Sequence, residues 1–358
     1  MFDVDGSYLE GGGQILRTTC ALSAITKKPC HIFNIRKGRE KPGLMPQHLL
    51  GIQALAQLCN GSLEGDFLDS EEIKFYPGET YRDRVSVNIQ TAGSITLVLQ
   101  TLILPSLFVP SPIRMTFNGG ATDTFFSPTI DYFRYAFLKI LEKMTEVRPR
   151  GPSKVGGWGE GCSLAIETNI IRRGYYPEGG AKVEVTVRQT KLKNLNLTER
   201  GSLKKIMIIS GASEFLKSKK VAERQLMGVR EVLGKLKLPV EEKVEYDPTQ
   251  CPGSQICLIA EFENTIIGTD NLGKLGKRAE DVGKEAALEL LKEEKTNACL
   301  DKHLADQILP YIALAKGKSQ FTVSKITNHF KTNIWVIEKF LEGTFKIEGN
   351  LIKWLPKS

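Results

Sequence analysis

Residues 8–19, with the sequence YLEGGGQILRTT, place three consecutive glycines between an acidic and a basic side chain. Glycine allows close approach to the backbone, and a helix that begins after it presents unpaired N–H groups and the positive end of its dipole. Such a junction is suited to binding anions, phosphate above all. On opposite sides of this loop, Glu10 has the chemistry to bind a divalent metal ion and Arg17 to bind a phosphate. The glycines alone are equally consistent with a tight strand-to-helix turn that binds nothing.

Two segments of the chain match standard nucleotide-binding motifs only in part. Gly11 and Gly13 would begin a G-x-G-x-x-G motif, but Leu16 occupies its last position. Residues 268–275, GTDNLGKL, match G-x-x-x-x-G-K and then end in Leu275, where a P-loop needs a hydroxyl for magnesium. We therefore exclude a dinucleotide fold of that type and a P-loop.

Histidine and cysteine spacing argues against a metal centre built from these residues. The four histidines show neither H-x-x-x-H nor H-x-H spacing. The seven cysteines contain no C-x-x-C pair, so they fit neither a disulfide framework nor a structural zinc site. We expect most of them to be buried thiols.

The composition is that of a soluble globular protein with more than one domain. The chain has 358 residues, 41% of them hydrophobic, and a formal net charge of +8, which favours an anionic partner, nucleic acid first. The start of the chain lacks the basic and apolar regions of a secretory signal. The most apolar segment, residues 96–110, is short for a membrane span and contains Gln100 and Pro105. We expect a cytoplasmic protein with no membrane partner.

Runs of β-branched residues alternate with helical patterns, which predicts a mixed α/β fold. Three segments, GGGQILRTTCALSAI, TAGSITLVLQTLIL and GKRAEDVGKEAALELL, each place small residues before an apolar helix and indicate a weak internal repeat. A polar, lysine-rich stretch opens a self-contained strand and helix pattern at residues 189–267. We interpret it as a small α/β domain inserted into a large catalytic domain, whose two parts are residues 1–188 and 268–358.

Six motifs, taken in order, resemble the RNA 3′-terminal phosphate cyclase family over the whole chain: EGGGQILR, IRKGREKPGLMPQHLLGIQA, AGSITLVLQT, RRGYYPEGG, HLADQILPYIALA and FTVSKITNHFKTNI. The resemblance implies ATP-dependent conversion of an RNA 3′-terminal phosphate to a 2′,3′-cyclic phosphate through enzyme-histidine-AMP and RNA-3′pp5′-A intermediates. The implied large domain has three repeated βα units similar to the C-terminal domain of translation initiation factor three, and the second domain is the smaller insert.

The resemblance also implies a site. His329 is the expected nucleophile, and Glu10 is the expected ligand of a divalent metal, Mg²⁺ or Mn²⁺. Guanidinium groups bind phosphate oxygens in pairs, and His303 and Pro128 would stack on the two faces of adenine. The residues implied to bind ATP or phosphate are Glu10, Gly11, Gly12, Gly13, Arg17, Arg36, Arg39, Gln47, His48, Gln100, Pro128, His303, Asp306 and Gln307.

Two other functions are weighed against the enzyme. One is a non-catalytic, pre-rRNA-binding ribosome-assembly protein of the same fold that lacks the adenylylated histidine, and the other is an enolpyruvyl transferase. The presence of His329, Glu10 and Arg17 favours the cyclase. Without the resemblance, each site residue also has a structural explanation, such as a solvated basic loop, a helix cap or a core amide. The physiological RNA, the preferred metal, the oligomeric state and the role of residues 148–162 are left open.

Overall fold

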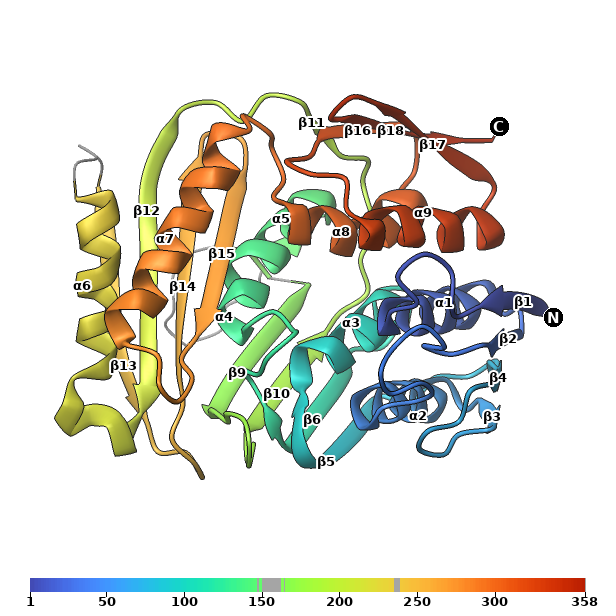
Figure 1. The fold of residues 1–358 in the computed structure, drawn as a ribbon. Helices are drawn as coiled ribbons and strands as arrows, with labels where there is room; N and C mark the ends of the chain where they lie inside the picture. The colour runs from blue at the N-terminus through green and yellow to red at the C-terminus, as the bar shows by residue number, and fades with distance from the viewer. Residues whose placement is uncertain (147, 150–161, 164, 235–238, 358) are drawn as a thin grey trace.

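The computed structural model describes residues 1–146, 148–149, 162–163, 165–234 and 239–357 (Figure 1). Within these ranges the strands form four four-stranded sheets and one two-stranded sheet, with helices packed on them. The predicted mixed α/β class is therefore confirmed. Most of the unexplained segment 148–162 lies outside the described residues, apart from the short strands β7 (Arg148–Pro149) and β8 (Cys162–Ser163).

Three of the four-stranded sheets share one connectivity. Each runs strand, helix, strand, helical segment, strand, strand, and its strands lie in the order first, second, fourth, third. In each sheet the first two strands pair in parallel and the remaining pairs are antiparallel. Three units of the same topology thus make up most of the molecule.

The elements of the first unit are β1 (Phe2–Asp5), α1 (Gly13–Thr26), β2 (Cys30–Phe33), α2 (Pro46–Cys59), β3 (Ser62–Glu64) and β4 (Ile73–Tyr76). Those of the second are β5 (Arg84–Ser94), α3 (Ile95–Ser106), β6 (Ile113–Ala121), α4 (Ile130–Tyr132), η1 (Phe133–Phe137), α5 (Leu138–Met144), β9 (Ile166–Arg172) and β10 (Lys182–Val187). Those of the third are β11 (Asn196–Leu197), α8 (Lys302–Leu314), β16 (Ser319–Thr322), α9 (Asn328–Phe340), β17 (Gly343–Glu348) and β18 (Leu351–Pro356).

The fourth sheet lies between β11 and α8 in the chain, on the left in Figure 1. Its elements are β12 (Leu203–Ser213), η2 (Glu214–Lys219), α6 (Val221–Leu233), β13 (Val240–Asp247), β14 (Ser254–Phe262), β15 (Ile266–Leu272) and α7 (Ala279–Lys295). Strands and helices of this group share a hydrophobic core of their own, which includes Ile267 and Val282. The domain boundaries at 189 and 267 stay a prediction, and we propose that the inserted unit continues through α7.

The prediction that the segment GKRAEDVGKEAALELL is the third member of the internal repeat is wrong. Helix α7 packs against α6 and β15, and the position equivalent to α1 and α3 in the third unit belongs to α8. One glycine of this segment has a local cause: a methyl group on Gly283, inside α7, would lie 1.9 Å from the carbonyl oxygen of Gln225 on α6. Close helix packing, rather than repetition, explains this glycine.

Four helices, α1, α3, α8 and α9, meet where the three units join (Figure 1). Helix α8 begins after Asp301, whose carboxylate accepts hydrogen bonds from the backbone N–H groups of His303 and Leu304 at 3.0 and 2.9 Å. Helix α9 begins at Asn328, after Thr327, whose hydroxyl caps it by accepting a hydrogen bond from the N–H of Phe330. His329 therefore lies in the first turn of a helix.

The apolar segment 96–110 forms most of α3, which is buried as predicted. No helix in the described part of the chain is long and apolar enough to cross a membrane. Six cysteines with described side chains are free and buried, in line with the expected thiols: Cys20, Cys30, Cys59, Cys251, Cys257 and Cys299.

Candidate active site

The glycine loop before α1 meets the first turn of α9. Nε2 of His329 lies 2.9 Å from Oε2 of Glu10, and Nη2 of Arg39 lies 3.9 Å from the other oxygen of that carboxylate. The side-chain amide of Gln14 donates a hydrogen bond to the carbonyl of His329 and ties the two helix starts together. Residues from opposite ends of the chain thus form one group of an imidazole, a carboxylate and a guanidinium.

The three glycines of the loop lie in three different structural environments. Gly11 has φ of +55°, a left-handed conformation that strains other residues. A methyl group on Gly12 would lie 3.6 Å from Cε1 of His329 and 3.7 Å from Nη2 of Arg39. A methyl group on Gly13 would lie only 2.0 Å from Nε2 of His48. Gly12 therefore borders the site, whereas Gly13 makes room for a buried ring.

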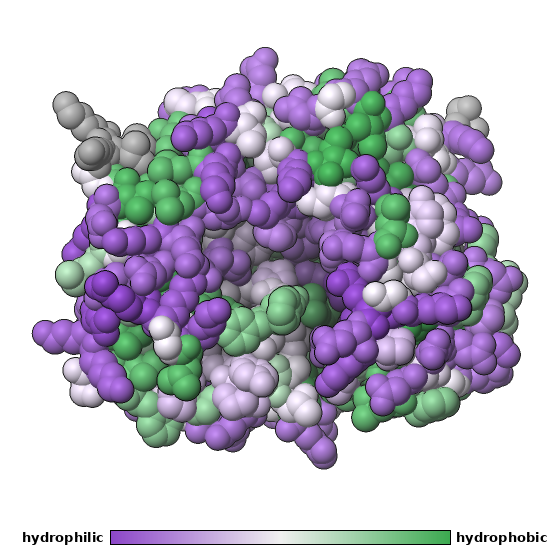
Figure 2. Space-filling model, viewed as in Figure 1, coloured by the Kyte–Doolittle hydropathy of each residue, from purple (hydrophilic) through white to green (hydrophobic). Residues whose placement is uncertain are grey.

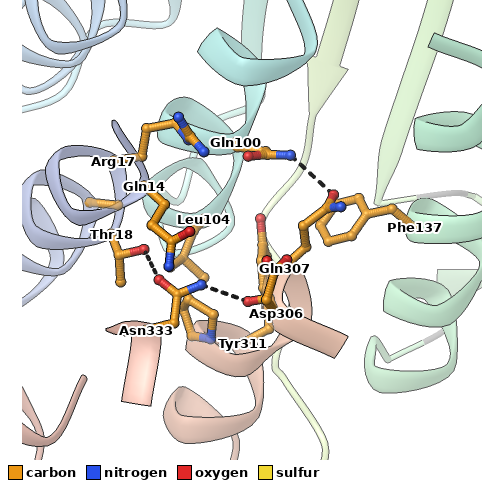
Figure 3. Close-up of a pocket in the computed structure, with 12 residues that line it drawn as sticks. Gln14, Arg17, Thr18, Gln100, Leu104, Phe137, Asp306, Gln307, Tyr311 and Asn333 are labelled. Atoms are coloured by element: carbon orange, nitrogen blue, oxygen red, sulfur yellow. Dashed lines mark hydrogen bonds between the residues drawn. The ribbon is translucent and has the colours of Figure 1, made fainter. Parts of the chain in front are cut away.

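A small cavity lies behind this group, between α1, α3, α8 and α9 (Figure 3). It holds about 50 Å³, well below the roughly 300 Å³ at the low end of small-molecule sites, so a nucleotide must lie outside it. Figure 2 shows a hollow with hydrophilic residues on its rim near the centre of this face, where α3, α4 and α8 approach one another in Figure 1.

Hydrogen bonds between helices hold the walls of this cavity (Figure 3). The amide of Gln100 on α3 donates to Oε1 of Gln307 on α8 at 3.0 Å, so this polar side chain in an apolar helix has a hydrogen-bond partner. The hydroxyl of Thr18 donates to Asn333, and the amide of Asn333 donates to the backbone carbonyl of Asp306 at 2.8 Å. These bonds join α1 and α9 to α8.

Arg17 brings an uncompensated positive charge to the cavity. Its guanidinium makes no ion pair within 4 Å and no hydrogen bond with any other residue that the structure describes, although the charge of Asp306 acts on it. Burial raises the pKa of Asp306 to about 8; Arg17 opposes this shift, while Asp301 and Glu10 add to it. The Asp306 carboxyl is therefore mostly neutral at pH 7, and Arg17 remains free to attract an anion.

Burial also disfavours the charged form of the two nearby histidines. It lowers the pKa of His329, and the positive charges of Arg17 and Arg39 lower it further against the opposing effect of Glu10. Burial and the charges of Arg17 and Arg36 lower the pKa of His48 to about 3. A neutral imidazole has a lone pair available on one nitrogen, which a nucleophile requires.

His48 and its neighbours line the inner side of the loop. The side chain of His48 is buried, and its Nδ1 accepts a hydrogen bond from the N–H of Met45 at 3.4 Å. Arg36 has a left-handed backbone conformation and donates to the carbonyl of Lys41, and burial and Arg39 lower its pKa. Gln47 lies in the first turn of α2, facing the end of β5.

Pro128 and His303 lie at the starts of α4 and α8. The carbonyl of Pro128 accepts a hydrogen bond from the hydroxyl of Thr96 on α3 at 2.8 Å, and the next N–H, that of Thr129, donates to Asp270 at 2.6 Å. His303 is exposed, and its charge acts on Asp270, whose pKa burial raises. Asp270 thus accepts a hydrogen bond next to Pro128 and interacts electrostatically with His303. The two residues predicted to stack on adenine therefore lie in the same part of the molecule.

Three polar residues of the site were missed from the sequence: Gln14, Thr18 and Asn333. Each is at most 7% exposed and lies on the buried face of α1 or α9. Polar side chains at core positions of an amphipathic helix are the signal that identifies such residues, because a buried polar group needs partners.

Glu10 alone cannot complete a metal site, so a metal ion bound to it would need further ligands from substrate or water. Among the described residues there is no group of three or more histidine, cysteine, aspartate or glutamate side chains that suits a metal. The side chain of Glu10 is 38% exposed, so one carboxylate can be reached from solvent. Mg²⁺ is commonly bound by one or two carboxylates together with substrate phosphates and water, and this donor set is compatible with that arrangement.

Sequence comparison with known proteins covers nearly the whole chain. A sequence profile described as RNA 3′-terminal phosphate cyclase matches residues 8–347. The RNA 3′-terminal phosphate cyclase of Pyrococcus abyssi is 44% identical over 354 residues, which cover 99% of this chain and 97% of that protein. The protein of the same name from Sulfurisphaera tokodaii is 41% identical over 352 residues, covering 98% and 96% of the two chains.

Proposed function

Because this chain belongs to the RNA 3′-terminal phosphate cyclase family of enzymes, we propose that it uses ATP to convert an RNA 3′-phosphate into a 2′,3′-cyclic phosphate. The observation that carries the proposal is the contact of His329 with Glu10 at 2.9 Å, beside Arg39 and the open backbone of Gly12. In this proposal His329 would serve as the nucleophile, Glu10 as the proton acceptor and Arg39 as a phosphate-binding cation, and the three side chains lie in one group.

In the first step, one ring nitrogen of His329 attacks the α-phosphorus of ATP, a P–N bond forms, and pyrophosphate leaves. Glu10, which lies at Nε2, would accept the proton that the imidazole gives up as the P–N bond forms. Arg39, next to Glu10, and Arg17, which forms no ion pair with a carboxylate in the described part of the chain, would offset the charge of the phosphates. A divalent ion on Glu10, Mg²⁺ or Mn²⁺, would supply further charge neutralisation when bound.

In the second step, an oxygen of the RNA 3′-phosphate attacks the phosphorus of the histidine-bound AMP and releases the imidazole. The product is an RNA whose 3′-phosphate is joined to AMP. The vicinal 2′-hydroxyl then attacks the RNA phosphate, AMP leaves, the hydroxyl proton passes to solvent, and the cyclic phosphate is closed. The helix start at Gly12 and Gly13 adds N–H groups on the side where these phosphates would lie.

The nucleotide base is proposed to lie over the mouth of the cavity. Pro128 and His303 would contact the two faces of adenine, and the amides of Gln100 and Gln307 with the carboxyl of Asp306 line the wall nearby. A neutral Asp306 retains an O–H donor at pH 7, which makes it a candidate for a hydrogen bond to a base nitrogen.

The proposal is tested with a short RNA that ends in a 3′-phosphate, incubated with ATP and Mg²⁺. The expected product resists phosphatase, becomes sensitive after mild acid opens the ring, and forms together with AMP. An RNA that is bound without any change at its end would refute catalysis and favour the non-catalytic assembly protein.

A further inference from the structure

A second, larger pocket lies where the inserted unit faces the second βα unit. It holds about 480 Å³, within the range of roughly 300–1,000 Å³ for ligand sites. Its walls come from the loop after β6, the β9–β10 turn, the start of α6 and the loop between β15 and α7. Two sequence motifs that the proposed reaction leaves unused meet here, RRGYYPEGG at 172–180 and GTDNLGKL at 268–275.

Aromatic rings are exposed at this pocket. Tyr176 is 59% exposed and Phe125 is 39% exposed, and the two rings meet edge to face with centroids 6.0 Å apart. Exposed aromatic rings on a monomer leave apolar area in water, and a base stacked on them would cover it.

The charges around the rings are mostly positive. Five lysine and arginine side chains line the pocket, and the one carboxylate among its lining residues, that of Asp123, is buried and paired with Arg173 at 3.2 Å. Lys219 and Lys274 are exposed and make no ion pair with another residue that the structure describes. Two free lysines beside two exposed rings match the phosphates and the base of a single-stranded nucleic acid.

Two chain segments connect the pocket to residues of the candidate active site. Phe125 precedes the proposed adenine wall, Pro128, by three residues. Lys274 follows Asp270 by four residues, and Asp270 accepts the hydrogen bond from the N–H of Thr129. A strand whose 3′ end lies at His329 could therefore continue past Pro128 towards these rings.

We propose that this pocket binds the substrate RNA upstream of its 3′ end, with one base stacked on Tyr176 and Phe125 and the flanking phosphates bound by Lys219 and Lys274. The assignment of the ligand as RNA rests on the proposed function. The contacts are with a base face and with phosphates, so they read no sequence and act only on strands long enough to reach the pocket.

The test compares two substrates, a dinucleotide with a 3′-phosphate and an RNA of about a dozen nucleotides with the same end. Tyr176→Ala and Lys274→Ala should each raise the KM for the longer RNA about tenfold, leaving the dinucleotide and the adenylylation of the enzyme by ATP unchanged. Tyr176→Phe should restore the longer substrate, because it keeps the ring. Lys274→Ala should also reduce the slope of log affinity against log salt by about 0.7.

Matched controls are Phe67→Ala, an exposed ring in the first unit, and Lys295→Ala, at the far end of α7 and about 24 Å along the helix from its start. Neither should change the KM for either RNA. An equal loss on both substrates would overturn the proposal, since the pocket would then act through the fold or the catalytic site. No loss on the longer RNA would also overturn it and leave the pocket to an acidic protein partner.

Equilibrium binding of the longer RNA, carrying a fluorescent label, tests the pocket independently of the proposed function. Weaker binding by Tyr176→Ala and Lys274→Ala, in a protein that never forms a cyclic phosphate, would retain the pocket and refute the proposed function. Unchanged binding in an active enzyme would refute the pocket alone.

Discussion

Gly13→Ala and Gly12→Ala should separate the structural glycine of the loop from the one that borders the site. In Gly13→Ala the new methyl group would lie 2.0 Å from Nε2 of His48, and the ring or the loop must move about 1.4 Å to restore a 3.4 Å contact. His48 is buried, so it cannot turn into solvent. Overpacking of this kind costs about 1–3 kcal/mol of unfolding free energy.

Gly12→Ala should behave in the opposite way. Gly12 has an extended backbone with φ of −84°, which alanine adopts without strain, so its unfolding free energy should change by less than about 1 kcal/mol. Its methyl group would fill the space 3.6 Å from Cε1 of His329, where the α-phosphate is proposed to approach. Adenylylation should fall about tenfold or more.

Urea denaturation measures the first effect and transfer of labelled AMP to the protein measures the second. The double variant Gly13→Ala with His48→Ala tests the cause, because without the ring the cost of Gly13→Ala should largely disappear. The reasoning is refuted if Gly13→Ala is as stable as the parent protein, or if its cost is the same with and without His48.

Three further predictions follow from the charges of the site. Arg17→Gln should slow adenylylation about a hundredfold with the fold intact by circular dichroism, and an unchanged rate would remove Arg17 from the phosphate site. Burial raises the pKa of Asp306 from 3.8 to about 8, so the folded state loses stability relative to Asp306→Asn as pH rises through this range; parallel pH profiles of melting would disprove that assignment. Cyclisation should weaken with salt yet tolerate any terminal base, and a strict base requirement would contradict phosphate-based recognition.

The fold class was predictable because apolar periodicity and β-branched runs report local structure. The third repeat was misassigned for a physical reason: small residues before a helix look the same whether they serve a ligand, a turn or helix packing. In this segment Gly283 lies inside α7 and allows close packing against Gln225, and only the sheet pairings identify α8 as the true counterpart.

The candidate site was predictable in part. The motif resemblance named His329, Glu10 and Arg39, and the structure brings them together from distant segments, although their roles stay predictions. The different environments of Gly12 and Gly13 depend on α2 and α9, far away in the chain, so no local pattern separates the two glycines. The raised pKa of Asp306 arises from burial, which only the assembled helices create.

The central claim is that His329 carries AMP, and covalent labelling tests it most directly. The protein is incubated with Mg²⁺ and ATP labelled at the α-phosphate, without RNA, and the adduct is examined for the acid lability of a phosphoramidate. The parent protein and His31→Ala should both become labelled, because the His31 imidazole lies on β2 and contacts Asp3 at 3.0 Å. His329→Ala should remain unlabelled. Persistent acid-labile label on folded His329→Ala would contradict the account and move the nucleophile to another residue.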